Sequence, residues 1–233
     1  MTAVTARPGA ALVPESKVRS LEEALAPITD GSTVMVGGFG GAGTPTALRE
    51  ALAQRRLGDL TLIANNSDFG SFVYPGGLRR VICSFPVGHS APLVLAAVEA
   101  GDVELQLTPQ GTLAERIRAA GAGLGGVLTP TGLDMEFGAG YREIEQDGRR
   151  WLLAPALPAD VALIKGAVAD TRGNIVCRYA GINFNPVMAM AARYTVAQVD
   201  RVVPFGDIDP QAVTIPSVLV DAVVELPTTT VEG

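Results

Sequence analysis

Residues Asp30–Pro45 read DGSTVMVGGFGGAGTP and contain, in order, a polar turn, a short apolar strand, a glycine-rich loop and a proline at the start of a helix. Glycine lets the backbone approach a ligand closely and adopt dihedral angles that are closed to other residues. The helix start behind the loop adds unsatisfied N–H donors and a partial positive charge. The stretch therefore predicts a strand–loop–helix unit that binds an anion or stabilises a developing oxyanion.

Outside this unit, apolar runs continue to alternate with helical patterns. Strands are predicted at residues 33–36, 60–64, 80–83, 103–107, 161–165 and 195–203, and helices at 16–28, 45–57, 91–100, 112–120 and 186–194. This rhythm indicates a three-layer α/β fold, an open and mainly parallel sheet with helices on both faces. Two hairpins, at 141–153 and 168–178, predict an antiparallel extension, and the glycine-rich residues 120–132 are expected to form a loop.

Length and composition limit the class of protein. A chain of 233 residues with no visible linker is expected to form one domain, 1–233, with a flexible tail over about 1–14. Aromatic residues make up only 5% and the net charge is −6, which argues against nucleic-acid binding. No basic cluster, membrane-length apolar run or signal-peptide core is visible, so we expect a cytoplasmic protein without a membrane partner.

Histidine and cysteine are too few for most metal or thiol chemistry. His89, the one histidine, is expected to be a loop residue, so neither a zinc site nor a Ser-His-Asp triad is predicted. Cys83 and Cys177 form no spacing motif and are interpreted as packing thiols.

The glycine loop by itself allows more than one ligand. Gly38, Gly40 and Gly43 satisfy the G-x-G-x-x-G spacing of dinucleotide-binding loops. That fingerprint also needs an acidic residue after the second strand, where only Asp68 is near, and a phosphate-binding P-loop needs a lysine that is absent. A tight turn that binds no ligand is the other alternative.

Several further motifs, taken in order, resemble family I CoA-transferases, specifically the α half of the 3-oxoacid CoA-transferases. The opening stretch is the first motif, and the similarity runs from about residue 18 to residue 224. The other motifs are Leu60-Thr-Leu-Ile-Ala-Asn-Asn66, Thr108-Pro-Gln-Gly-Thr-Leu-Ala-Glu-Arg-Ile-Arg118, Gly121-Ala-Gly123, Thr129-Pro-Thr-Gly132, Ala159-Asp-Val-Ala-Leu-Ile-Lys165, Gly173-Asn174 and Asn183-Phe-Asn-Pro-Val-Met-Ala-Met-Ala-Ala192.

The resemblance implies an α subunit that works only with a β subunit. The family moves CoA from an acyl-CoA, such as succinyl-CoA, to a 3-oxo acid such as acetoacetate or 3-oxoadipate, through a nucleophilic glutamate. That glutamate lies in a Ser-Glu-Asn-Gly motif of the β half, and none of the twelve glutamates here has that context. We therefore expect a heterodimer or heterotetramer, a CoA thioester as substrate, and no permanently bound cofactor or metal.

The same resemblance implies roles for particular residues. Gln110 is expected to donate its side-chain amide to the tetrahedral oxyanion. The residues expected to contact the thioester are Gly37, Gly38, Phe39, Gly40, Gly41, Ala42 and Gly43, and those expected in the substrate pocket are Asn65, Asn66 and Thr131. The residues alone leave alternatives open: Gln110 as a polar residue at a helix start, Phe39 as a core residue, and the two asparagines as turn caps.

Some positions depart from the family pattern. Ile182 stands where many relatives have arginine, and Asp134-Met135 replaces a common Gly-Thr. Glu115 and Arg118 are expected to form a surface ion pair, and Glu136 lacks the context of the family's nucleophile. The departures at Ile182 and Asp134-Met135 motivate one alternative function, a hydrolase or ring-opening enzyme that acts on a cyclic acyl-CoA. A binding subunit that kept the fold and lost catalysis is another alternative.

Overall fold

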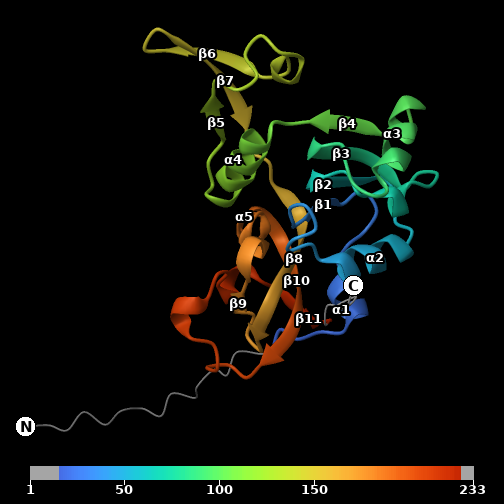
Figure 1. Ribbon diagram of the computed structural model, residues 1–233, viewed down its shortest axis with the longest axis vertical. Coiled ribbons are helices and arrows are strands. Elements are labelled where there is room, and N and C mark those ends of the chain that lie inside the picture. The colour runs from blue at the N-terminus through green and yellow to red at the C-terminus, as the bar shows by residue number, and fades with distance from the viewer. Residues whose placement is uncertain (1–15, 227–233) are drawn as a thin grey trace, which may run out of the picture.

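The computed structural model describes residues 16–226, so the tail expected at residues 1–14 lies outside the described part. Seven parallel strands form the central sheet in the order β11-β10-β8-β1-β2-β3-β4, and β9 pairs antiparallel with β8 (Figure 1). Their bounds are β1 (Thr33–Val36), β2 (Leu60–Asn66), β3 (Leu78–Phe85), β4 (Glu104–Leu107), β8 (Ala159–Asp170), β9 (Ile175–Val176), β10 (Ala192–Val203) and β11 (Ala222–Glu225).

Helices cover both faces of this sheet. One core cluster joins it to α1 (Leu21–Leu25), α2 (Thr46–Gln54) and α3 (Ala91–Glu99), and a second joins it to α4 (Gln110–Gly121) and α5 (Asn185–Ala191). Val34 and Val36 of β1 belong to the first cluster and Met35 to the second, because successive strand side chains point to opposite faces. The predicted three-layer α/β fold is therefore confirmed. None of the helices in residues 16–226 is long and apolar enough to cross a membrane.

The direction of the chain across the sheet reverses beside β1. From β1 the chain moves outward through β2, β3 and β4, and it later returns to β8 on the other side of β1. In open parallel sheets, ligands bind outside the carboxyl ends of the strands at such a reversal. The glycine loop follows β1 directly, so the topology places it at this position.

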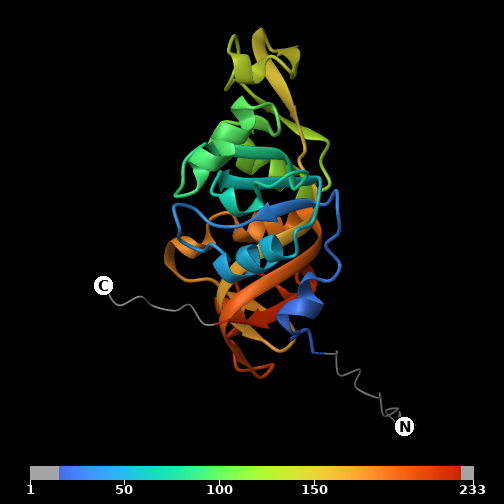
Figure 2. The ribbon, with the colours of Figure 1, turned by 90° about the vertical axis from the view of Figure 1, so that its right-hand side faces the viewer.

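A small antiparallel sheet stands away from the main body, as Figures 1 and 2 show. It consists of β5 (Gly126–Thr129), β7 (Arg149–Pro155) and β6 (Arg142–Gln146), with β7 in the middle. The turn between β6 and β7 has positive φ angles of 53° at Asp147 and 69° at Gly148, which suits a two-residue hairpin. The predicted hairpin is confirmed. The loop expected over 120–132 is wrong at residues 126–129, where backbone pairing with β7 makes β5 a strand.

Other helices and strands have different bounds from those predicted. The strand predicted at 161–165 and the first arm of the hairpin at 168–178 are one strand, β8, because β10 pairs with it as far as Asp170. The helix expected over 16–28 is reduced to α1, which begins after a capping box made by Ser20 and Glu23. Short 3₁₀ turns complete the chain: η1 (Gly70–Phe72), η2 (Glu136–Gly138), η3 (Tyr179–Ile182), η4 (Pro210–Ala212) and η5 (Ser217–Leu219).

Candidate active site

The glycine loop closes in a tight two-residue turn. The backbone N–H groups of Phe39 and Ala42 donate to each other's carbonyl oxygens at 3.0 Å, and Gly40 and Gly41 between them have φ angles of 54° and 89°. These angles match a type I′ turn, in which both central residues need positive φ and glycine is strongly favoured. The glycines of the motif therefore have a direct conformational cause.

This turn leaves backbone donors free. Within the described residues, the N–H groups of Gly38, Gly40 and Gly41 form no hydrogen bond with other protein atoms. The same three residues line a cavity of about 330 Å³ at the carboxyl edge of the sheet. Unpaired backbone N–H groups that line a cavity can bind an anion or stabilise an oxyanion.

The helix start behind the loop does not add free donors, contrary to the prediction. The Gln198 Oε1 atom, from β10, accepts hydrogen bonds from the N–H groups of Ala47 at 3.1 Å and Leu48 at 3.4 Å. The N–H of Thr46 donates to the Thr44 carbonyl at 2.9 Å, and Pro45 has no N–H. The buried Gln198 side chain thus caps α2, so the free backbone donors of the site belong to the loop and not to the helix start.

Asn185 holds the loop in place from the first residue of α5. Its buried side chain accepts a hydrogen bond from the Lys165 N–H at 3.0 Å and donates to the carbonyl oxygens of Gly43 at 3.0 Å and Gly181 at 2.7 Å. A Cβ atom on Gly37 would lie 1.9 Å from the Asn185 Oδ1 atom, so this contact requires glycine. The sequence contained Asn185 only as part of a motif, and no role was predicted for it.

A chain of side-chain amides connects Gln110 to the cavity. Gln110 is the first residue of α4, and its Nε2 atom donates to the Asn65 Oδ1 atom at 2.6 Å. Asn65 is buried and donates in turn from Nδ2 to the Asn66 Oδ1 atom, also at 2.6 Å, and Asn66 lines the cavity. The two asparagines and Gln110, which are far apart in sequence, thus come together at the ends of β2 and β4.

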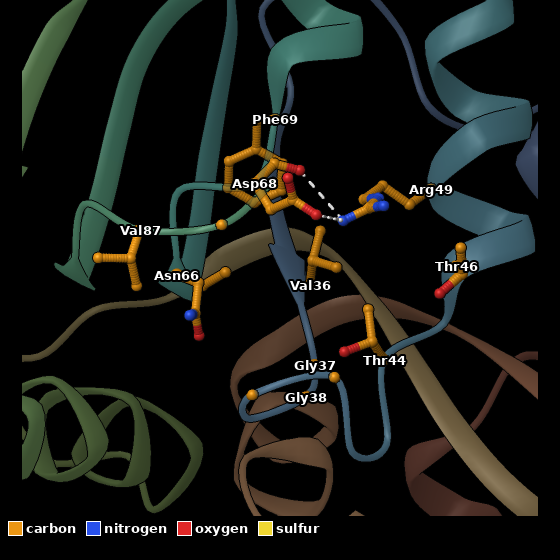
Figure 3. Close-up of a pocket in the computed structure, with 14 residues that line it drawn as sticks. Val36, Gly37, Gly38, Thr44, Thr46, Arg49, Asn66, Asp68, Phe69 and Val87 are labelled. Carbon is orange, nitrogen blue, oxygen red and sulfur yellow. Dashed lines mark hydrogen bonds and ion pairs between the residues drawn. The ribbon is translucent and has the colours of Figure 1, made fainter. Parts of the chain in front are cut away.

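An ion pair that the sequence did not predict forms part of the cavity wall. The Arg49 Nη1 atom on α2 donates to both the Oδ2 atom and the backbone carbonyl of Asp68, each at 3.1 Å (Figure 3). The Asp68 Oδ1 atom accepts from the N–H and the hydroxyl of Ser90, both at 2.7 Å. Burial raises the pKa of Asp68, but the Ser90 bonds and the Arg49 charge outweigh it, so the pKa is lowered overall.

Six residues proposed for the site do not line this cavity: Phe39, Ala42, Gly43, Asn65, Gln110 and Thr131. Phe39 is 46% exposed, so it is not a core residue, and it is not among the residues that line the cavity. Thr131 lines a separate cavity of about 300 Å³, together with Gly111 and Thr112 at the start of α4. The structure therefore brings together the glycine loop and Asn66, with Gln110 joined through Asn65, and it leaves Thr131 apart.

The residues that depart from the family pattern are also outside the cavity. Asp134 forms an ion pair with Arg150 at 2.9 Å in the antiparallel sheet, and Ile182 is 49% exposed. The predicted pair between Glu115 and Arg118 is confirmed, at 2.7 Å.

Other single residues match their predicted environments. His89 is an exposed loop residue, as predicted. Cys83 is a buried packing residue, and burial raises the pKa of its thiol to about 11. Glu136 is exposed in η2, and no glutamate of residues 16–226 lines the cavity at the glycine loop.

Known proteins resemble this chain over most of its length. A family model described as Coenzyme A transferase matches residues 18–226. One subunit of the 3-oxoadipate CoA-transferase of Pseudomonas putida is 44% identical over 210 residues, covering 88% of this chain and 91% of that protein. The corresponding subunit of the succinyl-CoA:3-ketoacid coenzyme A transferase of Xanthomonas campestris pv. campestris (strain B100) is 43% identical, covering 84% and 83%.

A solved structure shows the same fold in a longer chain. An acyl-CoA transferase from E. coli O157:H7, in a thioester complex with CoA, matches with a TM-score of 0.83 at 23% identity. The match covers 94% of this chain and 49% of that protein, so this chain spans about half of its length.

Proposed function

Because the chain belongs to the coenzyme A transferase family, we propose that it is the α subunit of a heteromeric 3-oxoacid CoA-transferase, in which it supplies the oxyanion-stabilising half of the active site. CoA thioesters are the substrates of this family, and the relatives are each named as one subunit of an enzyme, which implies a second. The partner we propose is a β subunit that carries the Ser-Glu-Asn-Gly motif.

One observation gives the strongest support to an active site that is shared between two subunits. Among the described residues, the cavity has three free N–H groups, from Gly38, Gly40 and Gly41, but no free carboxylate. Its one carboxylate, Asp68, is already bound by Ser90 and Arg49. Carboxylate attack on a thioester therefore needs a group that another chain brings to this edge of the sheet.

In the proposed mechanism, the partner's glutamate attacks the thioester carbonyl carbon and expels CoA as a thiolate, leaving a mixed anhydride. The thiolate then attacks the glutamyl carbonyl, which releases the first acid and forms a glutamyl-CoA thioester. The same two steps in reverse transfer CoA to the second acid. Each attack passes through a tetrahedral oxyanion, and the loop N–H groups together with the Gln110 amide are proposed to stabilise it.

For the substrates, we propose a 3-oxo acid as acceptor and succinyl-CoA as donor. Two relatives that are 44% and 43% identical are named for 3-oxoadipate and for succinyl-CoA with a 3-keto acid. We further propose that Asn65 and Asn66 contact the substrate, that the protein acts in the cytoplasm, and that it needs no permanently bound cofactor. Because Thr131 lines a different cavity, its proposed contact would be with another part of the substrate.

The proposal is tested by reconstituting the enzyme. The chain is co-expressed with a β-type chain that carries the Ser-Glu-Asn-Gly motif, and CoA transfer from succinyl-CoA to 3-oxoadipate or acetoacetate is measured. We expect activity from the complex and none from this chain alone, and size-exclusion chromatography with light scattering distinguishes a heterodimer from a heterotetramer.

The control replaces the glutamate of the partner's motif with glutamine. We expect this complex to assemble normally and to lose CoA transfer. Two results contradict the proposal: transfer by this chain alone, or release of free CoA by the complex when no acceptor acid is present.

A further inference from the structure

The proposed mechanism assigns no role to the ion pair between Arg49 and Asp68 in the cavity wall. Among the fourteen residues that line the cavity, Arg49 is the only base and Asp68 the only acid. Their side chains are 17% and 31% exposed, so the pair is largely shielded from bulk water. An arginine so placed, in the same cavity as the free N–H groups of the glycine loop, is positioned to contact a bound molecule.

The hydrogen-bonding capacity of Arg49 is only partly used. Both of its hydrogen bonds within the described residues come from Nη1 and go to Asp68. The Nε atom is buried and has no partner, and Nη2 has no partner but is not among the buried atoms. A guanidinium group has five N–H donors in a planar fork that suits carboxylates, so this one can still donate to a carboxylate that enters the cavity.

Asp68 is the more firmly held member of the pair. Its Oδ1 atom accepts two hydrogen bonds from Ser90, and its Oδ2 atom is bound to Arg49. Figure 3 shows Arg49 reaching from α2 toward Asp68 on one side of the cavity, with Gly37 and Gly38 on the other. Asp68 is therefore held by Ser90 independently of Arg49, and it occupies only one nitrogen of the guanidinium group.

Between these two sides the lining suits a short carbon chain. Val36, Ala64, Phe69 and Val87 contribute apolar surface, and the volume of about 330 Å³ is at the small end of ligand pockets. An acyl group fits this description better than the nucleotide part of CoA. An acyl carbonyl at the glycine loop would have its far end directed at Arg49.

We propose that Arg49 is the specificity-determining residue of this chain, where it binds the distal carboxylate of a dicarboxylic acyl group whose reacting carbonyl lies at the glycine loop. The assignment rests on the proposed function, because it takes the loop as the thioester-binding element. It selects, among 3-oxo acids, those with a second carboxylate. Asp68 sets the strength of this contact, because it competes with the ligand for the same guanidinium group.

A purely structural ion pair would behave differently, and two substitutions distinguish the cases. Arg49→Met removes the carboxylate-binding group, so it should weaken binding of the dicarboxylic acid. Asp68→Asn keeps an oxygen for Ser90 but removes the competing charge, so it should strengthen that binding. If the pair only supports the fold, both substitutions should weaken the protein and its ligand binding together.

The experiment compares two acids of equal length, 3-oxoadipate and 3-oxohexanoate, which differ in the distal carboxylate. Their binding to the complex with the β-type chain is measured by calorimetry, and kcat/KM is measured for each as acceptor. Arg49→Met should lower the binding affinity and kcat/KM for 3-oxoadipate by at least about tenfold, as expected for loss of a charge-assisted hydrogen bond. For 3-oxohexanoate the same two quantities should change by less than about twofold. Asp68→Asn should raise binding of 3-oxoadipate.

Controls separate folding from recognition. Arg49→Lys keeps the charge without the planar fork and should show an intermediate loss, and melting temperatures report the stability of each variant. Arg80→Met breaks an exposed ion pair with Glu104 outside the cavity, so it should leave the binding affinity and kcat/KM for both acids unchanged.

The outcomes for this proposal and for the proposed function are distinct. Equal losses for both acids in Arg49→Met, or weaker binding of 3-oxoadipate in Asp68→Asn, overturn the assignment of Arg49. A complex that forms no CoA ester of either acid contradicts the proposed function, and the calorimetric comparison still tests Arg49 in that case.

Discussion

The side chain of Gln110 is held at the candidate site by a hydrogen bond to Asn65. One N–H of its amide is bound to the Asn65 Oδ1 atom at 2.6 Å, which leaves the second N–H for a ligand. Because Asn65 is buried and is itself bound to Asn66, it fixes the direction in which the Gln110 amide points. A donor held in place before the reaction stabilises a developing charge without further reorganisation.

The role of Gln110 predicts a defect in the rate. In the complex, Gln110→Ala should lower kcat by about 100- to 1,000-fold while the KM for the acyl-CoA changes little, because the contact strengthens in the transition state. Steady-state kinetics with the reconstituted complex measure both constants. Gln146→Ala, at an exposed position of β6, is the matched control and should have no effect. A loss of less than about threefold in Gln110→Ala would show that this amide does not contact the oxyanion.

The lowered pKa of Asp68 predicts how the stability of the fold depends on pH. Its pKa in the folded protein lies below the ordinary value of 3.8, so the ionised form stabilises the fold. That contribution is fully present above about pH 3.8 and is lost as the pH falls through the lower pKa of the folded state. The difference in unfolding free energy between the native chain and Asp68→Asn, measured by urea unfolding, should therefore be constant near neutral pH and shrink below about pH 4. A difference that grows on acidification would contradict this.

Among the structural elements, the glycine loop depends on a helix that lies far away in the sequence. Asn185 of α5 binds the loop at Gly43 and also binds β8 at Lys165, so it joins the loop after β1 to the neighbouring strand β8. The same side chain occupies the space where Gly37 would need room for a Cβ atom. The loop conformation is thus set jointly by local glycine dihedrals and by this buried asparagine.

This dependence predicts an energetic coupling between loop and helix. Gly37→Ala and Asn185→Ala should each lower the free energy of unfolding by about 3 kcal/mol, since one displaces the asparagine and the other leaves its three partners unpaired. The double variant should lose at least about 1 kcal/mol less than the sum, because the clash disappears with the asparagine side chain. Chemical unfolding of the four proteins measures the cycle.

Gly111→Ala is a suitable control for this cycle. A Cβ atom on Gly111 meets nothing within 4 Å, and the residue is helical, so alanine should stabilise the chain by about 0.5–1 kcal/mol. Additive losses in the Gly37–Asn185 cycle would show that the contact between these two residues does not govern the loop conformation.

For the molecule as a whole, the carboxyl edge of the sheet also exposes apolar surface. Phe39 at the tip of the glycine loop is 46% exposed, and Phe85 at the end of β3 is 45% exposed. Exposed aromatic residues beside a site that lacks its nucleophile suit the surface on which a partner chain would bind. The site and the expected interface would then share one edge of the molecule.

This arrangement predicts where association is sensitive to charge. Phe85→Asp should weaken binding of the β-type chain by at least about tenfold, because a charge would be buried at the centre of the interface. Val218→Asp, at a position that is 84% exposed in η5 and lines neither described cavity, should leave association unchanged. Analytical ultracentrifugation of the mixed chains measures both. Equal affinities of the two variants for the β-type chain would show that the interface lies on another face of the molecule.

The alternating pattern of strands and helices, the glycine turn and the family motifs were all readable from the chain, because each depends on residues close together in sequence. Side-chain alternation assigns Val34 and Met35 to opposite faces, and Gly40-Gly41 needs only its own backbone to turn. The hairpin around Asp147-Gly148 was predictable for the same reason.

The contacts that complete the site depend on pairs far apart in sequence, and they emerged only from the folded structure. Gln198 occupies the donors of α2 that local reasoning left free, Asn185 fixes the loop, and Asp68 pairs with Arg49 in the cavity wall. No local pattern encodes such pairs, because strand order and register decide which distant side chains meet. The chain by itself therefore identified the class of chemistry, whereas the packing of its elements set which donors are free and which charges line the cavity.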